Sequence, residues 1–211
     1  MVVDVKVHID IQHRFLLSMP EDIVVAIGGG KIHCNNNPCQ YNKALYTATM
    51  ITVKEMKMCD ADDDLALIEL SRNILESDST PICMPEFDLQ LKPVLYASGI
   101  GMDLSTPITF HNPNGDIAHG QQVVALRYLA VDHVLHQIVT VTFAKTICQG
   151  DSGGPLFQVN EDGRHILVGI NSNILGSCTH HSENIGNVLT DVRAHSDWIC
   201  KYSGLIENSY P

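Results

Sequence analysis

The chain has 211 residues, of which 45% are hydrophobic and 18% are charged, which is enough apolar content for one large or two small cores. The formal net charge is −11, with 13 Lys and Arg against 24 Asp and Glu, and this argues against a general nucleic-acid binder. No apolar stretch reaches the ~18 residues that span a bilayer, and the eleven histidines are scattered without the spacing of a zinc site. We therefore expect no cofactor, no metal, no nucleic-acid partner and no membrane partner.

Short β-branched runs dominate the chain and indicate an all-β fold. The predicted strands, separated by clusters of Gly, Asn, Asp and Pro, cover residues 23–27, 48–53, 123–126, 138–143 and 166–170. Such a series is typical of a sandwich or a barrel. Helical spacing occurs once, where His195, Trp198, Ile199 and Tyr202 recur three or four residues apart. It predicts a C-terminal helix over residues 191–202 that ends before Gly204.

The most specific motif runs from residue 148 to residue 156 and reads Cys-Gln-Gly-Asp-Ser-Gly-Gly-Pro-Leu. Glycines on both sides of Ser152 let the backbone turn sharply and expose the hydroxyl. Gly150 can turn its amide, together with that of Ser152, toward a developing oxyanion. Asp151 is too close in sequence to orient a base and, once buried, needs a cationic partner. The run predicts that Ser152 is a nucleophile, and the alternative is a glycine-rich turn between strands.

This run resembles the nucleophile segment of the chymotrypsin-like serine proteases, the S1 peptidase family. Upstream, Asp64 begins the run Asp-Leu-Ala-Leu-Ile-Glu-Leu, which is similar to the segment that supplies the aspartate of that family's triad. Weaker similarities lie at residues 81–85, 97–101, 168–172 and 198–199, so that the match covers roughly residues 45 to 203. The resemblance implies a serine endopeptidase in which Ser152 is the nucleophile, Asp64 orients a histidine, and the amides of Gly150 and Ser152 are the oxyanion donors. It also implies protein or peptide substrates, with protease inhibitors as a further class of partner.

The same resemblance implies two antiparallel β-barrels and a C-terminal helix, with the active site in the cleft between the barrels. Residues 1–80 would form the first barrel, which is incomplete, and residues 81–211 the second barrel and the helix. Asp64 would lie on the first barrel and Ser152 on the second. The resemblance further implies secretion and synthesis as a zymogen, although the first ten residues lack the features of a secretory signal.

The family's general base lies in a Thr-Ala-Ala-His-Cys-like segment, and the sequence contains no such segment. An Ile-Val-Gly-Gly-like amino terminus, whose α-ammonium group would insert beside Asp151, is also missing. His13 precedes Asp64 at a separation close to that in the family but lacks the motif's small neighbours, and His8 and His33 are weaker candidates. We expect that the chain begins just after the segment with the true histidine. Such a chain would be nearly inert, because loss of the base lowers kcat of serine hydrolases by about 10⁶.

The seven cysteines are an odd number, and none form the CxxC pairs of a structural metal site. By resemblance, Cys148 pairs with Cys178 and closes the wall of the substrate pocket, which would stabilise the fold by roughly 3–4 kcal/mol. Also by resemblance, the partner of Cys83 lies on an activation segment that this chain does not contain. The alternative is a cytosolic protein with seven buried, reduced thiols.

The remaining cysteines have no unique assignment. Cys34 and Cys39 flank a turn-like tetrad and could close on each other, while Cys34 with Cys59 is a competing pair. The sequence identifies no partner for Cys200, and none for Cys59 outside that competing pair.

The pocket residues that the resemblance implies predict an uncharged substrate side chain. Thr146 lies at the base of the primary pocket, where no carboxylate is available to pair with an incoming Arg or Lys. Ile174 and, less securely aligned, Asn187 replace small residues of the pocket walls. Ser172, also at the pocket, keeps a structural role near Asp64. The alternative function is a non-catalytic protease homologue that binds and regulates partners through the same cleft.

Overall fold

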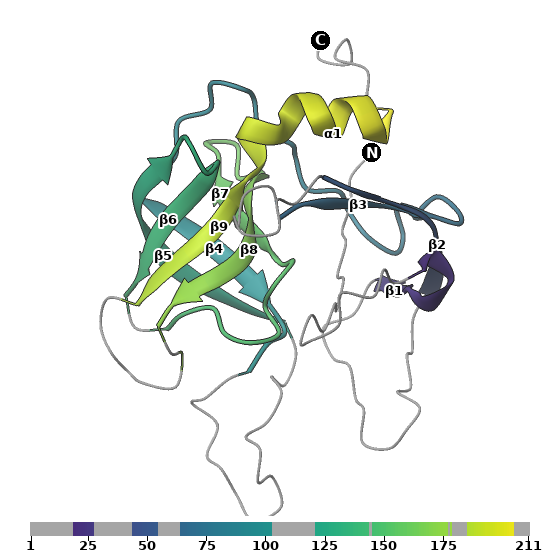
Figure 1. The fold of residues 1–211 in the computed structure, drawn as a ribbon, viewed down its shortest axis with the longest axis horizontal. Coiled ribbons are helices and arrows are strands. Elements are labelled where there is room, and N and C mark those ends of the chain that lie inside the picture. Colours follow the sequence, from purple (N-terminus) through teal and green to yellow (C-terminus); the bar gives the residue numbers. More distant parts are fainter. Residues whose placement is uncertain are drawn as a thin grey trace, which may run out of the picture.

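The computed structural model describes residues 19–27, 44–54, 64–102, 121–143, 145–176, 178 and 185–204. Within these ranges the chain is mainly β-strand, with one α-helix near the carboxyl end (Figure 1). The strands are β1 (Val24–Ile27), β2 (Ala44–Val53), β3 (Ala66–Leu70), β4 (Val94–Gly99), β5 (Gln122–Asp132), β6 (Gln137–Thr142), β7 (Pro155–Val159), β8 (His165–Leu175) and β9 (Gly186–Asp191). A 3₁₀ turn, η1 (Pro20–Asp22), precedes β1, and a second, η2 (Val192–His195), leads into the helix α1 (Ser196–Ser203).

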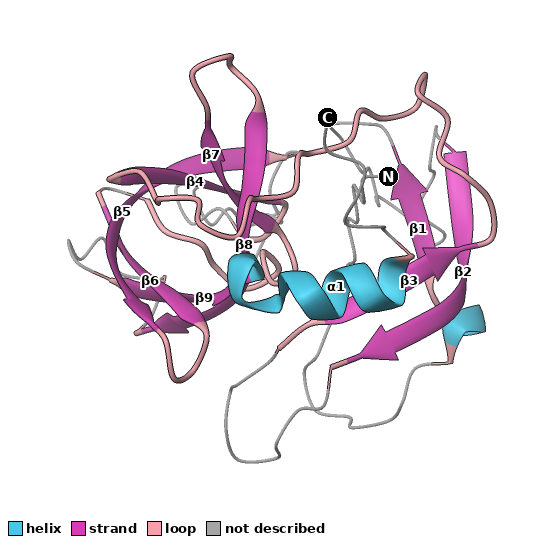
Figure 2. Cartoon of the chain, turned by 90° about the horizontal axis from the view of Figure 1, so that it is seen from above, coloured by secondary structure: helices cyan, strands magenta, loops and turns pink. Residues whose placement is uncertain are grey.

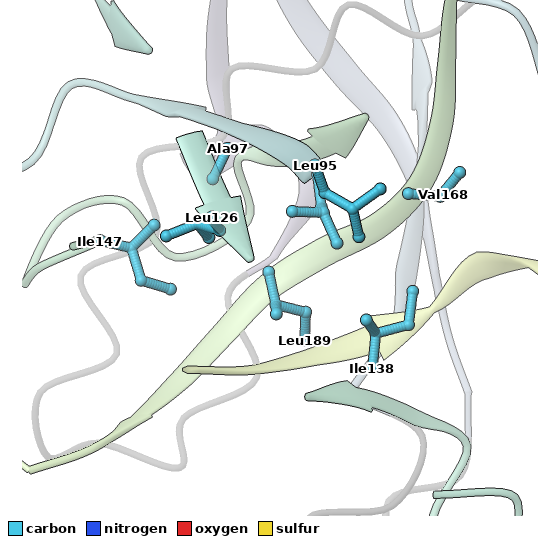
Figure 3. Close-up of a cluster of buried hydrophobic side chains, with 8 residues drawn as sticks. Leu95, Ala97, Leu126, Ile138, Ile147, Val168 and Leu189 are labelled. Atoms are coloured by element: carbon cyan, nitrogen blue, oxygen red, sulfur yellow. The ribbon is translucent and has the colours of Figure 1, made fainter. Parts of the chain in front are cut away.

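Six antiparallel strands close into a barrel in the order β4-β5-β6-β9-β8-β7. The ring is complete because β4 pairs with both β5 and β7. Side chains alternate between the two faces of a strand, so Leu95 and Ala97 of β4 point inward and pack with Leu126 of β5 (Figure 3). The other buried members of this cluster are Ile138, Ile147, Leu156, Val168 and Leu189. The barrel therefore forms a rigid support for the turn that carries Ser152.

The amino-terminal strands form a separate antiparallel sheet in the order β1-β2-β3. Its buried cluster consists of Val25, Ile27 and Tyr46, and the Tyr46 hydroxyl donates to Asp78 Oδ2 (3.0 Å). Within the described ranges these three strands form an open sheet, and the incompleteness of the first barrel stays a prediction. The division of the chain between residues 80 and 81 stays a prediction.

The helix α1 lies across one end of the molecule, from the barrel toward the three-stranded sheet (Figures 1 and 2). Ile199 of the helix packs with Val192 and with Leu65, the residue that leads into β3. Trp198 packs against the same cluster. Since Asp64 directly precedes Leu65, this apolar contact determines where Asp64 lies relative to the barrel.

The structure confirms the all-β fold with a C-terminal helix. The predicted strands correspond to β1, β2, β5, β6 and β8, of which β2, β5 and β8 extend further than predicted. The predicted helix start at Asp191 is wrong, because the Asp191 side chain accepts a hydrogen bond from Arg193 N and caps the 3₁₀ turn η2 instead. The helix ends as predicted, with Gly204 (φ 71°) in the left-handed conformation that glycine favours. Of the helices in the described part of the chain, none is long and apolar enough to cross a membrane.

Candidate active site

Ser152 is exposed in the turn that leads into β7. The turn is closed by a hydrogen bond from Gly154 N to Asp151 O (3.0 Å). Gly150 and Gly153 have φ values of 94° and 79°, a region that residues with a Cβ rarely adopt. The glycines of the motif therefore permit the sharp turn that the sequence predicts, and the Ser152 side chain is accessible.

The Asp151 carboxylate is held by two backbone amides. Its Oδ1 accepts from Gly101 N (2.7 Å) and its Oδ2 from Cys148 N (2.8 Å). Burial raises the pKa of this carboxyl above its ordinary value of 3.8, and the two N–H donors oppose that shift by favouring the charged form. We expected a cationic partner, but the hydrogen-bond partners within the described ranges are these backbone groups. The carboxylate fits against the end of β4 because Gly99 has no side chain, and a Cβ there would lie 2.7 Å from the carboxylate carbon.

The N–H groups of Gly150 and Ser152 donate to no residue within the described ranges. The carbonyls of the same two peptides are bonded: Gln149 O accepts from Met102 N (2.9 Å), and Asp151 O is bonded as described above. A trans peptide is planar, with its N–H opposite its carbonyl, so these bonds fix the directions of both N–H groups. Fixed donors beside a nucleophile can stabilise an oxyanion. The assignment of Gly150 and Ser152 as oxyanion donors stays a prediction.

Asp64 and Ser152 both contact Ser172 of β8. The Ser172 hydroxyl donates to Asp64 Oδ2 (2.8 Å), and Ser152 Oγ lies 3.5 Å from the Ser172 carbonyl oxygen. The Asp64 backbone is anchored as well, because Thr190 Oγ1 donates to its carbonyl (3.1 Å). The fold thus brings the predicted nucleophile and the predicted aspartate within reach of a single residue, and it places Ser172 beside Asp64 as expected.

A general base is not among these contacts. The hydrogen-bond partners of Asp64 and Ser152 in the described part of the chain include no histidine. The candidates His13, His8 and His33 lie outside the described residues. Within the described ranges, no group of three or more His, Cys, Asp or Glu side chains could hold a metal ion.

The predicted pocket residues Thr146, Ile174 and Asn187 lie together. Thr146 Oγ1 donates to Asn187 Oδ1 (2.6 Å), and Asn187 Nδ2 donates to Thr140 Oγ1 (3.3 Å). Asn187 is 0% exposed. Ile174 is its cross-strand partner in the β8–β9 pair, and such partners project from the same face of a sheet. The group is uncharged, and its hydroxyls and carboxamide bond to one another.

The disulfide between Cys148 and Cys178 is present, with Cα atoms 5.5 Å apart, so that pairing is confirmed. Cys83 and Cys200 are free thiols within the described ranges. The proposed pairings of three other cysteines lie outside the described residues, namely those of Cys34, Cys39 and Cys59.

The sequence reasoning missed the contribution of Asn171. Its side-chain amide contacts the turn that carries Ser152, as described below. The sequence predicts only a strand over residues 166–170 and a weak family similarity over residues 168–172. The available signal was a carboxamide directly after the apolar run Val168-Gly169-Ile170, since a polar side chain in a buried strand needs hydrogen-bond partners.

Comparison with known proteins places this site in a family. The family model described as Trypsin matches residues 20–199. Tissue-type plasminogen activator of Homo sapiens is 31% identical over 169 residues, covering 71% of this chain and 29% of that protein. The suppressor of tumorigenicity 14 protein homolog of Bos taurus is 28% identical over 149 residues, covering 65% and 16%, respectively. Serine proteinase stubble of Drosophila melanogaster is 28% identical over 157 residues, covering 66% and 19%. The matched region therefore spans less than a third of each relative, but the family model covers most of this chain, and the chain belongs to the trypsin family of S1 serine peptidases.

Proposed function

We propose that this chain is the catalytic region of a serine endopeptidase, in which Ser152 attacks the substrate carbonyl and Asp64 orients a histidine base. The observation that carries the proposal is the position of Ser172, which hydrogen-bonds Asp64 through its hydroxyl and contacts Ser152 Oγ through its carbonyl. At 3.5 Å the latter contact is long for an O–H···O bond, so the Ser152 hydroxyl remains available to a base. Membership of the trypsin family supports the same chemistry.

The proposed reaction is acyl transfer to Ser152. The base takes the proton from Ser152 Oγ while that oxygen bonds to the peptide carbon, and it then passes the proton to the leaving amine. The carbonyl oxygen becomes an oxyanion, which the N–H groups of Gly150 and Ser152 stabilise. Loss of one such donor lowers kcat by about 10²–10³, whereas loss of the base lowers it by about 10⁶. Activity therefore depends above all on the base, for which a histidine on a preceding segment is the first candidate and His13 the less favoured alternative.

The substrate preference is proposed to be a small or medium uncharged side chain. The supporting observation is the bonded group of Thr146, Asn187 and Thr140, which offers no carboxylate to a cation. An Arg or Lys side chain placed there would lose its hydration without gaining an ionic partner. Ile174 occupies space beside Asn187 and would favour a short side chain.

Secretion and synthesis as a zymogen are part of the proposal. The disulfide between Cys148 and Cys178 supports an oxidising compartment, where such bonds form and persist. Cys83 is a free, half-buried thiol within the described ranges, and it would be available to bond a cysteine on an activation segment.

The pocket residues also favour a second candidate function, a non-catalytic homologue that binds partners through the same cleft. With Thr146, Asn187 and Ile174 as the pocket residues, the Thr146–Asn187 hydrogen bond and the adjacent Ile174 would leave little space for a substrate side chain. In that case the cleft would recognise a protein partner, such as a protease inhibitor, without cleaving it.

A fluorophosphonate probe separates the two candidate functions, because it forms a covalent bond only with an activated serine. In a protein that includes the histidine base, we expect the wild type to be labelled and Ser152→Ala to be unlabelled, while Ser77→Ala, at an exposed serine in a loop, is labelled like the wild type. Equal labelling of Ser152→Ala and wild type would exclude Ser152 as the nucleophile. Absence of labelling in all three proteins would favour the non-catalytic homologue. For the pocket, we expect poor cleavage after Arg, and efficient cleavage there would contradict the proposed preference.

A further inference from the structure

We propose that Asn171 is a positioning residue for the oxyanion donor of Ser152. Its side-chain amide holds the carbonyl of Asp151, and thereby fixes the direction of the Ser152 N–H group. This inference rests on the proposed function of Ser152 and adds a residue that acts through the backbone rather than on the substrate.

The Asn171 carboxamide is buried at the junction of three segments. The residue is 1% exposed, and its Nδ2 donates to Asp151 O (3.1 Å) and to Ser98 O (3.2 Å). The first acceptor belongs to the turn that carries Ser152, and the second lies near the end of β4. Burying an amide is unfavourable unless it forms hydrogen bonds. These two hydrogen bonds explain why an amide nitrogen can be buried at this position.

The backbone of Asn171 is bonded to the same turn. Asn171 N donates to Gly154 O (2.8 Å), and Gly153 N donates to Asn171 O (2.8 Å). The side-chain bond to Asp151 O therefore acts on a segment that is already held against β8. A shift of Asn171 relative to the turn would break all of these bonds together.

The Asp151 carbonyl transmits this restraint to Ser152. A carbonyl oxygen has two lone pairs, and here one accepts from Gly154 N (3.0 Å) and the other from Asn171 Nδ2 (3.1 Å). The carbonyl and the Ser152 N–H belong to one planar peptide. Rotation of that peptide, which would misdirect the N–H group, therefore requires both hydrogen bonds to break.

Two further observations separate this role from simple packing. Gly154 leaves the space that the amide occupies, because a Cβ there would lie 2.9 Å from Asn171 Nδ2 and 2.9 Å from Asp151 O. Asn171 Oδ1 accepts no hydrogen bond from any residue in the described part of the chain. A buried acceptor without a partner opposes folding, and an apolar side chain of similar shape would avoid that penalty. The hydrogen bonds that the Asn171 nitrogen donates therefore explain the carboxamide better than the volume of the side chain does.

The test uses Asn171→Leu, which keeps the approximate shape and removes the donor. Two quantities are measured in the same base-containing protein: the orientation of the Ser152 N–H bond, from residual dipolar couplings, and the second-order rate constant of fluorophosphonate labelling. We expect a changed N–H orientation and a labelling rate lower by about 10- to 100-fold, somewhat less than the 10²–10³ lost when an oxyanion donor is removed outright. Asn160→Leu, the same substitution in the turn at the far end of β7, is expected to change neither quantity.

A second variant, Asn171→Asp, distinguishes hydrogen bonding from shape and covers the case in which Asn171→Leu does not fold. The introduced carboxyl has no donor when ionised and one O–H donor when protonated. We therefore expect its labelling rate relative to wild type to increase as the pH is lowered, whereas a role in shape alone predicts a constant ratio.

The outcomes distinguish failure of this inference from failure of the proposed function. If the wild type is labelled and Asn171→Leu matches it within twofold with an unchanged N–H orientation, the positioning role is overturned and the nucleophile stands. If the wild type is not labelled but the N–H bond reorients in Asn171→Leu, the positioning role is supported and the proposed hydrolase fails. If Asn171→Leu is unfolded, a pH-independent ratio in Asn171→Asp overturns the positioning role.

Discussion

Gly99→Ala tests whether the Asp151 carboxylate is held by the contacts described above. Gly99 is the last residue of β4, and its backbone is outside the left-handed region, so alanine is allowed there on conformational grounds. The added Cβ would lie 2.7 Å from Asp151 Cγ and 2.9 Å from Asp151 Cβ. Carbon atoms in ordinary contact are about 3.5–4.0 Å apart. The carboxylate must therefore move by about 1 Å.

That movement breaks the hydrogen bonds from Gly101 N (2.7 Å) and Cys148 N (2.8 Å). A hydrogen bond to a charged group contributes about 1.5–3 kcal/mol, so the loss is about 3–6 kcal/mol. The lower backbone entropy of alanine in the unfolded chain offsets about 0.5–1 kcal/mol of this. Asp151 is only half-buried, so the displaced carboxylate regains some water. We expect a net decrease of about 2–5 kcal/mol in the free energy of unfolding.

The assay is urea denaturation followed by the fluorescence of Trp198, since the chain has one Trp and this residue packs against the cluster of Leu65, Val192 and Ile199. Gly186→Ala is the control, because the Cβ there would meet a flexible atom, Leu175 Cδ1, at 3.2 Å. We expect the control to lose less than about 1 kcal/mol. A loss in Gly99→Ala no greater than that of the control would refute the argument.

Other parts of the structure give further predictions. Burial raises the folded-state pKa of Asp151, so its contribution to stability is fully present below the unfolded value of 3.8 and is lost as the pH rises through the folded value. The wild type should therefore lose stability relative to Asp151→Asn as the pH rises in urea denaturations from about pH 3 to pH 7, and a constant difference would count against this. Arg193→Met leaves the carboxylate of Asp191, which is 3% exposed, without its bidentate partner. We expect the free energy of unfolding, measured by the same assay, to decrease by about 3–5 kcal/mol. A decrease below ~1 kcal/mol would mean that the pair is not effectively buried. Replacing Cys148 and Cys178 together by Ala should lower the free energy of unfolding by about 3–4 kcal/mol and make it insensitive to dithiothreitol, and a variant as stable as wild type would argue that the disulfide does not form.

The features predicted correctly from the sequence are those that depend on short segments of backbone. The turn at Ser152 follows from glycines whose conformations, at Gly150 and Gly153, other residues rarely adopt. The end of α1 follows from Gly204 in the same way. The disulfide between Cys148 and Cys178 was predicted from the resemblance to S1 peptidases, because a distinctive local run identifies the family.

Most contacts between distant segments were decided only by the tertiary structure. The resemblance led us to expect Ser172 near Asp64, 108 residues away, but it gave no sign that the amide of Asn171 reaches carbonyls 20 and 73 residues away. The start of α1 was mispredicted because the side chain of Asp191 caps a 3₁₀ turn. Asp151 was expected to need a cation, yet within the described ranges it bonds to amides that the end of β4 and the preceding turn present. A local pattern shows that a side chain is polar and needs a partner, but the partner is determined by the packing of the barrel, which brings together segments whose sequences carry no mutual signal.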